Sequence, residues 1–311
     1  MLNTLAFAAE TIAPIFALIL VGLVLKRKAV IGDSFISTSS VLVYRLVLPV
    51  MLFQRMSVVD SIPADLYLGM AVLAGATILV FIGSWKAFSR MEGPIMGSMV
   101  QGGFRGNITI LGLAVIESSY GSSAVQIAVV FLIVLMPLFN FLAIVILSHS
   151  SGHQEGSIAK KVWSELIRNP LIWGILLGLP FGLLDITLPG VVVNSMDYVG
   201  RLTLPLALIG IGGSLNMKSL MGRKLLWSGA SAIKLLVLPA FVWLLARAFS
   251  ITGDILVTLV VFAACPTAVT SFVMAEALGA DSELAGEIVS ATTLFSMLTL
   301  TFWIGMLASF V

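Results

Sequence analysis

The sequence predicts an all-α polytopic membrane protein, with ten transmembrane helices arranged as two inverted five-helix repeats. Three observations support this prediction. Hydrophobic residues make up 59% of the 311 residues and charged residues only 10%, whereas a soluble domain carries about 25% charged residues. Apolar runs of roughly 20 residues, long enough to span a bilayer, recur along the whole chain. Several proline, glycine, arginine and glutamate residues of the first half also recur at matching positions in the second half.

Ten apolar segments are predicted to be helices, because a backbone in lipid must satisfy its own polar groups. Their ranges are 4–25, 35–56, 65–88, 94–117, 123–147, 168–185, 190–213, 224–249, 254–279 and 284–310. The chain is predicted to be a single transmembrane domain, with a first repeat at about 1–147, a polar loop at about 148–167 and a second repeat at about 168–311. The N-terminus lacks the basic region of a signal peptide, so the first segment is expected to stay as a membrane helix.

The basic residues favour one orientation, because cytoplasmic loops are enriched in Lys and Arg. With the N-terminus outside, the outer side receives Arg55 and Arg247. The residues that then fall on the cytoplasmic side are Lys26, Arg27, Lys28, Lys86, Arg90, Lys160, Lys161, Arg168, Lys218, Arg223 and Lys224. Both termini are therefore predicted outside, and the central loop in the cytoplasm.

The second half repeats features of the first. Gly22 and Gly178 are 156 residues apart, and residues 45–49 (RLVLP) match 201–205 (RLTLP) at the same spacing. Further along, Glu117 matches Glu276 at a spacing of 159. Each half holds five helices, an odd number, so the second half enters the membrane from the opposite side. Inverted repeats are typical of secondary transporters; a chance match in a sequence of low diversity is the alternative.

The fourth apolar segment contains the run QGGFRGNIT, which is poor material for a lipid-facing helix. Gly103 and Gly106 weaken a helix and allow another backbone to approach. A helix break here would expose a half-helix N-terminus, which favours an anion, and Asn107 can donate and accept hydrogen bonds. Arg105 is suited to a bidentate contact with a carboxylate. The alternatives are close packing of small residues, and for Arg105 a structural pair or a snorkelling position.

The ninth segment contains the counterpart of this run. Pro266 aligns with Asn107 at the spacing of 159, and a proline inside a helix removes an N–H and clashes with the preceding turn. Thr267 and Thr270 are then available to cap freed backbone groups or to bind a solute. Segments four and nine are therefore predicted to be broken and to cross near the membrane midplane, with a simple proline kink as the alternative.

The remaining prolines and charged residues within the apolar segments are expected to have structural roles, or their role is left undecided. Pro49 and Pro205 are expected to shape the helices beside the crossing. Arg45 and Arg201 precede these prolines by one helical turn, and a structural role is favoured for both. Lys234 has no evident partner in the sequence. No nucleotide-binding loop, nucleophile elbow or zinc motif is present, so no enzymatic activity is expected.

Several of these runs resemble motifs of the auxin efflux carrier family of membrane transporters. Residues 46–53 (LVLPVMLF) are similar to a Leu-Pro segment of that family, and residues 104–112 resemble its Arg-Gly-Asn crossover region. Residues 275–281 (AEALGAD) and 290–296 (SATTLFS) are similar to its C-terminal part. The resemblance covers essentially the whole chain.

The resemblance implies a bile-acid-transporter-like fold, with a scaffold and a panel, and movement of organic anions such as auxin in plants or malate and malonate in bacteria. Plant members have Asn-Pro pairs at both crossovers and usually a much longer central loop. Here Asn107 is followed by Ile108, Pro266 is preceded by Cys265, and the loop is short. The chain is therefore more similar to compact bacterial-type members, and the resemblance implies a location in a bacterial inner membrane.

We predict a secondary active transporter of a small organic anion, a malate- or malonate-like carboxylate or an auxin-like acid, working by alternating access. The candidate substrate-binding residues are Arg105, Asn107, Thr109, Pro266, Thr267 and Thr270. No cofactor or metal is expected, and coupling to an H⁺ or Na⁺ gradient is left open, as is a homodimer. The expected partners are the organic anion and membrane lipid, not nucleic acid. A membrane solute sensor and a channel-like facilitator without ion coupling are the alternatives.

Overall fold

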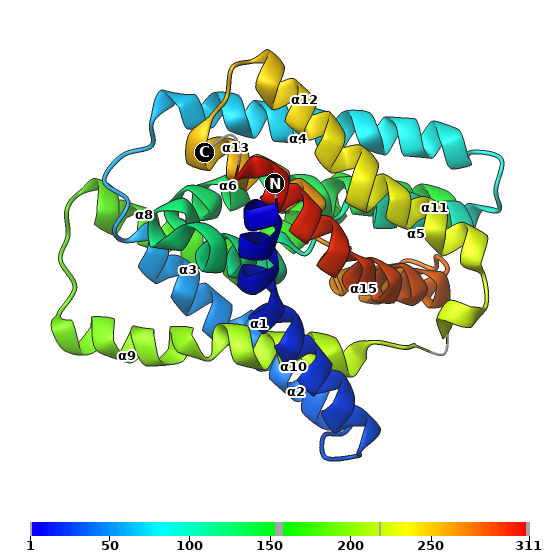
Figure 1. Cartoon of the computed structure of the whole chain (residues 1–311), viewed down its shortest axis with the longest axis horizontal. Coiled ribbons are helices and arrows are strands. Elements are labelled where there is room, and N and C mark those ends of the chain that lie inside the picture. The colour runs from blue at the N-terminus through cyan, green and yellow to red at the C-terminus, as the bar shows by residue number, and fades with distance from the viewer. Residues whose placement is uncertain (1, 153–157, 218, 309–311) are drawn as a thin grey trace.

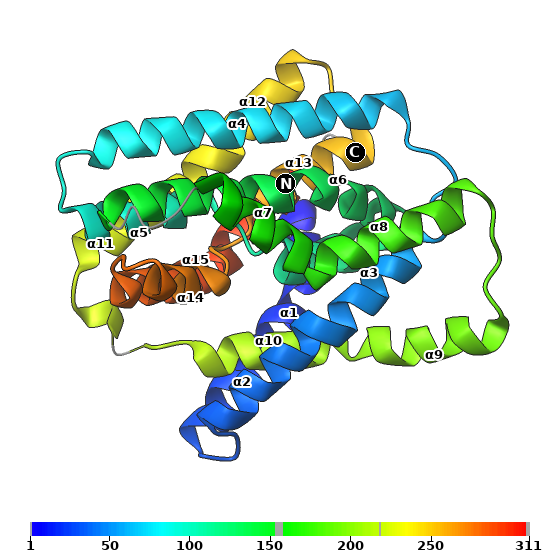
Figure 2. The ribbon, with the colours of Figure 1, turned by 180° about the vertical axis from the view of Figure 1, so that it is seen from behind.

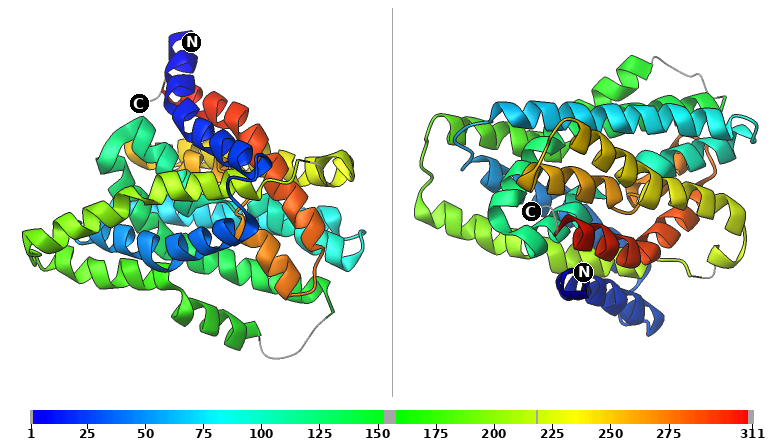
Figure 3. Two further views of the ribbon diagram at one scale, coloured as in Figure 1. Left: turned by 90° about the horizontal axis from the view of Figure 1, so that it is seen from below. Right: turned by 45° about the horizontal axis from the view of Figure 1, so that its top comes forward.

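The computed structural model describes residues 2–152, 158–217 and 219–308. Within these ranges the chain is helical apart from turns, short connections and one isolated β-bridge. The long helix α4, Ala64–Phe88, lies along one side of the molecule, and α9, Gly190–Arg201, and α10, Thr203–Ser214, lie along the opposite side (Figures 1 and 2). Helix α1, Leu2–Arg27, packs against α15, Ser282–Leu307, so the first and last helices lie side by side (Figure 3).

The helices of the first half follow the predicted segments closely. Their bounds are α1 Leu2–Arg27, α2 Asp33–Leu42, the π-helix η1 Val43–Val47, α3 Leu48–Met56, α4 Ala64–Phe88, α5 Gly93–Phe104, the π-helix η2 Ile108–Gly112 and α6 Leu113–Ser150. The backbone of α6 is interrupted at Gly121, whose φ of 79° is a conformation that glycine adopts readily and other residues rarely do.

The second half is divided in a similar way. Its bounds are α7 Ile158–Arg168, α8 Pro170–Leu183, α9 Gly190–Arg201, α10 Thr203–Ser214, the 3-10 helix η3 Ser219–Met221, α11 Lys224–Ala232, the π-helix η4 Ile233–Val237, α12 Leu238–Ala248, α13 Gly253–Ala264, α14 Thr270–Ala277 and α15 Ser282–Leu307. The structure differs from the predicted central loop at α7, which is helical and carries an exposed Trp163.

Six helices in the described ranges are long and apolar enough to cross a membrane, and one bent pair would make a seventh. The six are Ala6–Arg27, Asp33–Met56, Ala64–Phe88, Ser123–Ser150, Lys224–Ala248 and Ser282–Leu307, and the bent pair is Val162–Arg168 with Pro170–Leu183. Helices occupy all ten predicted segments, but the fourth, seventh and ninth segments are interrupted. The short helices α5 and α13 have 12 residues each, so neither is long enough to span a bilayer alone.

The centre of the molecule is formed by α13, where every residue from Leu256 to Ala264 is buried. It packs against α6, α12 and α15. A helix that is apolar on all sides is enclosed by others, so the end of α13 lies deep inside the protein.

Glycines bring two pairs of helices into backbone contact. A Cβ on Gly212 of α10 would lie 1.9 Å from the carbonyl oxygen of Ile19 in α1, and one on Gly22 would lie 2.2 Å from that of Ile209. In the second pair, Cβ atoms on Gly174 and Gly178 of α8 would lie within 2.5 Å of carbonyl oxygens of α3. Small residues at these positions are typical of membrane helix interfaces.

Replacing Gly212 by Ala is expected to destabilise the protein, because the new methyl group meets backbone that must move; overpacking of this kind costs about 1–3 kcal/mol. The matched control is Gly75→Ala in α4, where nothing lies within 4 Å of the added Cβ and alanine favours the helix. Melting temperatures of both variants in detergent test this. A Gly212→Ala protein that melts no lower than Gly75→Ala would show that α1 and α10 are not in close contact.

Candidate functional site

The two interrupted segments meet at their breaks. After α5 ends at Phe104, the backbone of Arg105 is extended and the helix resumes at Ile108. The amide of Asn107 donates to the carbonyl of Pro266 at 2.7 Å, and the amide of Ala268 donates to the carbonyl of Arg105 at 3.1 Å. These bonds flank the antiparallel β-bridge between Gly106 and Thr267, so each break satisfies backbone groups of the other.

The break in the ninth segment follows from its sequence. Pro266 has no N–H to donate to the carbonyl four residues earlier. The amide of Thr267 donates to the Thr292 hydroxyl oxygen at 3.0 Å, and the Thr267 hydroxyl donates to the carbonyl of Gly102 at 2.8 Å. Thr267 therefore ties the break to α15 and to the end of α5.

A cavity of about 370 Å³ lies beside the crossing. Four of the predicted binding residues line it, namely Arg105, Asn107, Thr109 and Thr270. Pro266 and Thr267 are not among the lining residues, since the carbonyl of one and the hydroxyl of the other bond to the chain itself. The cavity extends from the break along α14 as far as Ala277.

Arg105 brings a guanidinium to the wall of this cavity. The residue is 8% exposed. Its Nη2 donates to Oδ1 of Asn140 at 2.9 Å and lies 3.3 Å from the Thr270 hydroxyl, and its Nη1 lies 2.8 Å from the sulfur of Met274. These three partners are neutral side chains that hold the guanidinium in place.

Asn107 adds a polar group on the same wall. Its carbonyl accepts from the amides of Leu111 and Gly112 and starts the next helix. Asn107 lines the cavity and is 7% exposed. The helices that begin at Ile108 and Thr270 both start at the cavity, and helix N-termini favour negative charge.

Comparison with known proteins identifies the family of this chain. A family model described as "Membrane transport protein" matches residues 7–304. The chain belongs to the auxin efflux carrier family of membrane transporters.

Relatives of this transporter occur in archaea and plants. A protein described as an uncharacterized transporter from Methanothermobacter thermautotrophicus is 23% identical over 95% of this chain and 97% of its own length. Auxin efflux carrier component 2 of Arabidopsis thaliana is 29% identical over 44% of this chain. The matched stretch covers only 22% of that plant carrier.

Sequence reasoning missed several residues of the transporter's cavity. Asn140, in α6, is buried and holds Arg105; Asn169 is buried and caps α8 by accepting from the amide of Leu171 at 3.0 Å. Tyr44 and Met274 also line the cavity. A buried asparagine in an apolar segment is a detectable signal, but its partner is set by tertiary packing.

The residues expected to shape helices lie at interruptions or close contacts. Pro49 follows the π-helix η1, and its backbone contacts Gly174. Pro205 lies three residues after Leu202, where α9 gives way to α10. A Cβ on Gly103 would lie 3.2 Å from the Ile233 side chain, and one on Gly106 would lie 3.1 Å from Nζ of Lys234.

A set of polar contacts joins neighbouring helices near the C-terminal end of α3. Arg55, at the end of α3, forms a half-buried ion pair with Glu117. The hydroxyl of Ser118 donates to the carbonyl of Thr11 at 3.0 Å. Asp197 of α9 accepts a hydrogen bond from the Gln54 side chain of α3 at 2.6 Å. Arg45 and Arg201 are both exposed.

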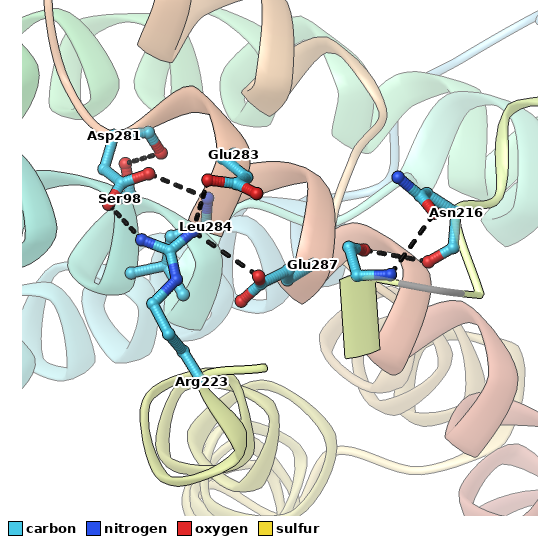
Figure 4. Close-up of polar contacts among 8 residues, drawn as sticks. Ser98, Asn216, Arg223, Asp281, Glu283, Leu284 and Glu287 are labelled. Carbon is cyan, nitrogen blue, oxygen red and sulfur yellow. Dashed lines mark hydrogen bonds and ion pairs between the residues drawn. The ribbon is translucent and has the colours of Figure 1, made fainter. Parts of the chain in front are cut away.

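A second polar cluster joins helix ends at the other end of the molecule (Figure 4). Arg223 pairs with Asp281 at 2.5 Å and with the buried Glu287 at 3.4 Å. Asp281 also caps α15 by accepting from the amide of Leu284, and its carbonyl accepts from Ser98 of α5. Burial lowers the pKa of the Arg223 guanidinium, but the hydrogen bonds and charges of Asp281 and Glu287 together outweigh this and hold the pKa above its ordinary value. This cluster clamps α5, α11 and α15 together.

The described residues contain no group of three or more His, Cys, Asp or Glu side chains that could hold a metal ion. Cys265 is fully buried at the break.

Proposed function

We propose that this transporter is a secondary active carrier of a small organic anion and works by alternating access. The observation that carries the proposal is the cavity at the crossing, with the Arg105 guanidinium, the Asn107 amide and two helix N-termini on its wall. A guanidinium binds a carboxylate with charge-assisted hydrogen bonds. The cavity volume of about 370 Å³ suits a small metabolite.

We further propose that all ten helical segments cross the membrane, as two inverted repeats whose broken helices cross near the midplane. Two related contacts support this symmetry. Gly22 of α1 packs on α10 and Gly178 of α8 packs on α3, and these glycines are the pair that the 156-residue spacing brings into register. The breaks bond to each other through their backbones, as expected for a crossover that binds substrate. The whole chain is then one transport domain.

The direction in which the cavity extends supports a state that is open towards the cytoplasm. The residues that line the cavity run from the break to Ala277 at the end of α14 and to Asn169, which follows α7 and caps the start of α8. At the opposite end, Arg55 and Glu117 tie α3 to α6. The positive-inside bias assigns the open end to the cytoplasm. We propose a cytoplasm-open state in a bacterial inner membrane, with both termini outside.

The proposal predicts saturable transport of a labelled small dicarboxylate, malate or malonate, by purified protein in proteoliposomes. Counterflow against unlabelled substrate is expected, because a carrier exposes its binding site to each side of the membrane in turn. The Asn107→Ala protein is expected to fold normally but to show no counterflow. Initial rates under separately imposed proton and sodium gradients then report the coupling ion.

Three results would contradict the proposal in different ways. Flux that does not saturate and shows no counterflow would indicate a channel-like facilitator. Binding without flux would indicate a solute sensor. Unchanged counterflow by a well-folded Asn107→Ala protein would remove the crossing from the mechanism.

A further inference from the structure

Lys234 is the buried charge that the proposed binding site does not use. It lies in the π-helix η4, inside the span Lys224–Ala248, and is 0% exposed. Its Nζ donates to the carbonyl oxygen of Ala263 at 2.6 Å. No acidic side chain in the described ranges forms an ion pair with it. A lysine in this position is costly unless a specific partner compensates its charge.

The break in α13 provides that partner. In an intact helix, the carbonyl of Ala263 would accept from the amide four residues later, which belongs to Thr267. That amide donates to Thr292 instead. The Ala263 carbonyl is therefore one of the unsatisfied groups at a helix C-terminus, and the ammonium of Lys234 satisfies it.

The second broken helix reaches the same ammonium. η4 packs against both α5 and α13. A Cβ on Gly106, two residues after the end of α5, would lie 3.1 Å from the Lys234 Nζ, and 3.3 Å from the Phe262 carbonyl oxygen. A side chain at this position would therefore press closely on the ammonium and on that carbonyl. The ammonium thus lies between the ends of the two half-helices.

The charges at this point balance. Each helix C-terminus carries roughly half a negative elementary charge. The C-termini of α5 and α13 together therefore carry about one negative charge, which a single ammonium offsets. In transporters with broken helices, unwound carbonyls and half-helix C-termini are where a coupling cation binds, while the N-termini face the anionic substrate. Here the N-terminal ends face the cavity and the carbonyl end faces Lys234.

We infer that Lys234 acts as a tethered cation: its ammonium occupies the cation position of the crossing, which therefore needs no bound Na⁺. Lys234 is a positioning residue, since it sets the two breaks against each other and does not line the substrate cavity. The inference rests on the proposed function only for its transport readout.

Removing the ammonium should leave a hole that a small free cation can enter. The test compares Lys234→Ala, which opens this space, with Lys234→Met, which fills it without charge, and with Lys224→Met, an exposed lysine ten residues earlier as the control. The first measurement is the melting temperature of each purified protein in choline, sodium or methylammonium chloride. We expect wild type and Lys224→Met to melt at the same temperature in all three salts. Lys234→Ala should melt several degrees lower in choline and recover in methylammonium, whereas Lys234→Met should not recover.

The second measurement is malate counterflow, which needs no ion gradient. Wild-type counterflow should be the same in sodium and in choline, and Lys234→Met should be slower by about tenfold or more, the usual effect of losing one charged hydrogen bond. Sodium-dependent counterflow or sodium-dependent melting of the wild type would overturn the inference, as would a Lys234→Ala protein that is equally stable in choline and methylammonium. If the wild type shows no counterflow at all, the proposed function fails, while the melting series still decides the role of Lys234.

Discussion

Replacing Arg105 by Gln is expected to raise the concentration of dicarboxylate that half-saturates transport by about 10- to 100-fold, because charge-assisted hydrogen bonds contribute about 1.5–3 kcal/mol. Glutamine keeps a polar side chain that can still bond to Asn140 but removes the positive charge from the cavity wall. Initial rates of uptake into proteoliposomes over a range of malate concentrations measure the effect.

Two further variants separate charge from geometry. Arg105→Lys retains the charge without the bidentate fork and should recover part of the affinity. Lys224→Gln removes an exposed positive charge outside the cavity and should change nothing. If Arg105→Gln and Arg105→Lys lose affinity equally in folded protein, Arg105 supports the crossing and does not bind the substrate carboxylate.

Joining positions 55 and 117 covalently is expected to abolish transport almost completely. In the structure Arg55 and Glu117 tie α3 to α6 at the closed end, and alternating access requires these elements to separate there. The double variant Arg55→Cys with Glu117→Cys can be joined by a short bismaleimide. The native Cys265 is fully buried, so the reagent should leave it unmodified.

The unlinked double variant serves as the control. It should transport at close to the wild-type rate, because a partly exposed ion pair contributes only about 0–1 kcal/mol. Each single cysteine variant treated with the reagent should also stay active. Transport that continues after complete linkage, measured by a gel shift after proteolysis between the two sites, would show that this end does not open.

The breaks and helix contacts could be predicted because their causes are local. Pro266 removes an N–H wherever it lies inside a helix, and the glycines around Arg105 weaken one. The spacing that pairs Gly22 with Gly178 likewise identified two positions that the structure places at close helix contacts.

The partners of the site residues could not be predicted, because they depend on packing between distant segments. Asn140 lies 35 residues from Arg105, and Thr270 lies 165 residues from it. Thr267 was expected in the binding site, yet its hydroxyl bonds to Gly102 and its amide to Thr292. A threonine beside a freed carbonyl can satisfy the backbone or a ligand, and only the geometry of the neighbouring helices decides between them. The helix α7 was missed because a short charged segment has no long apolar run to mark it.

The mutual bonding of the two breaks has a consequence for how the protein is made. The backbone groups of Arg105 and Asn107 find their partners in Ala268 and Pro266, about 160 residues later in synthesis. At 5–20 residues per second, a ribosome takes roughly 10–30 s to add that length. During this interval the first five helices hold an unpaired break in a bilayer that offers no water to satisfy it. The nascent first half should therefore remain beside the insertion machinery until the ninth segment arrives, so that membrane integration and tertiary folding are completed in a single late step.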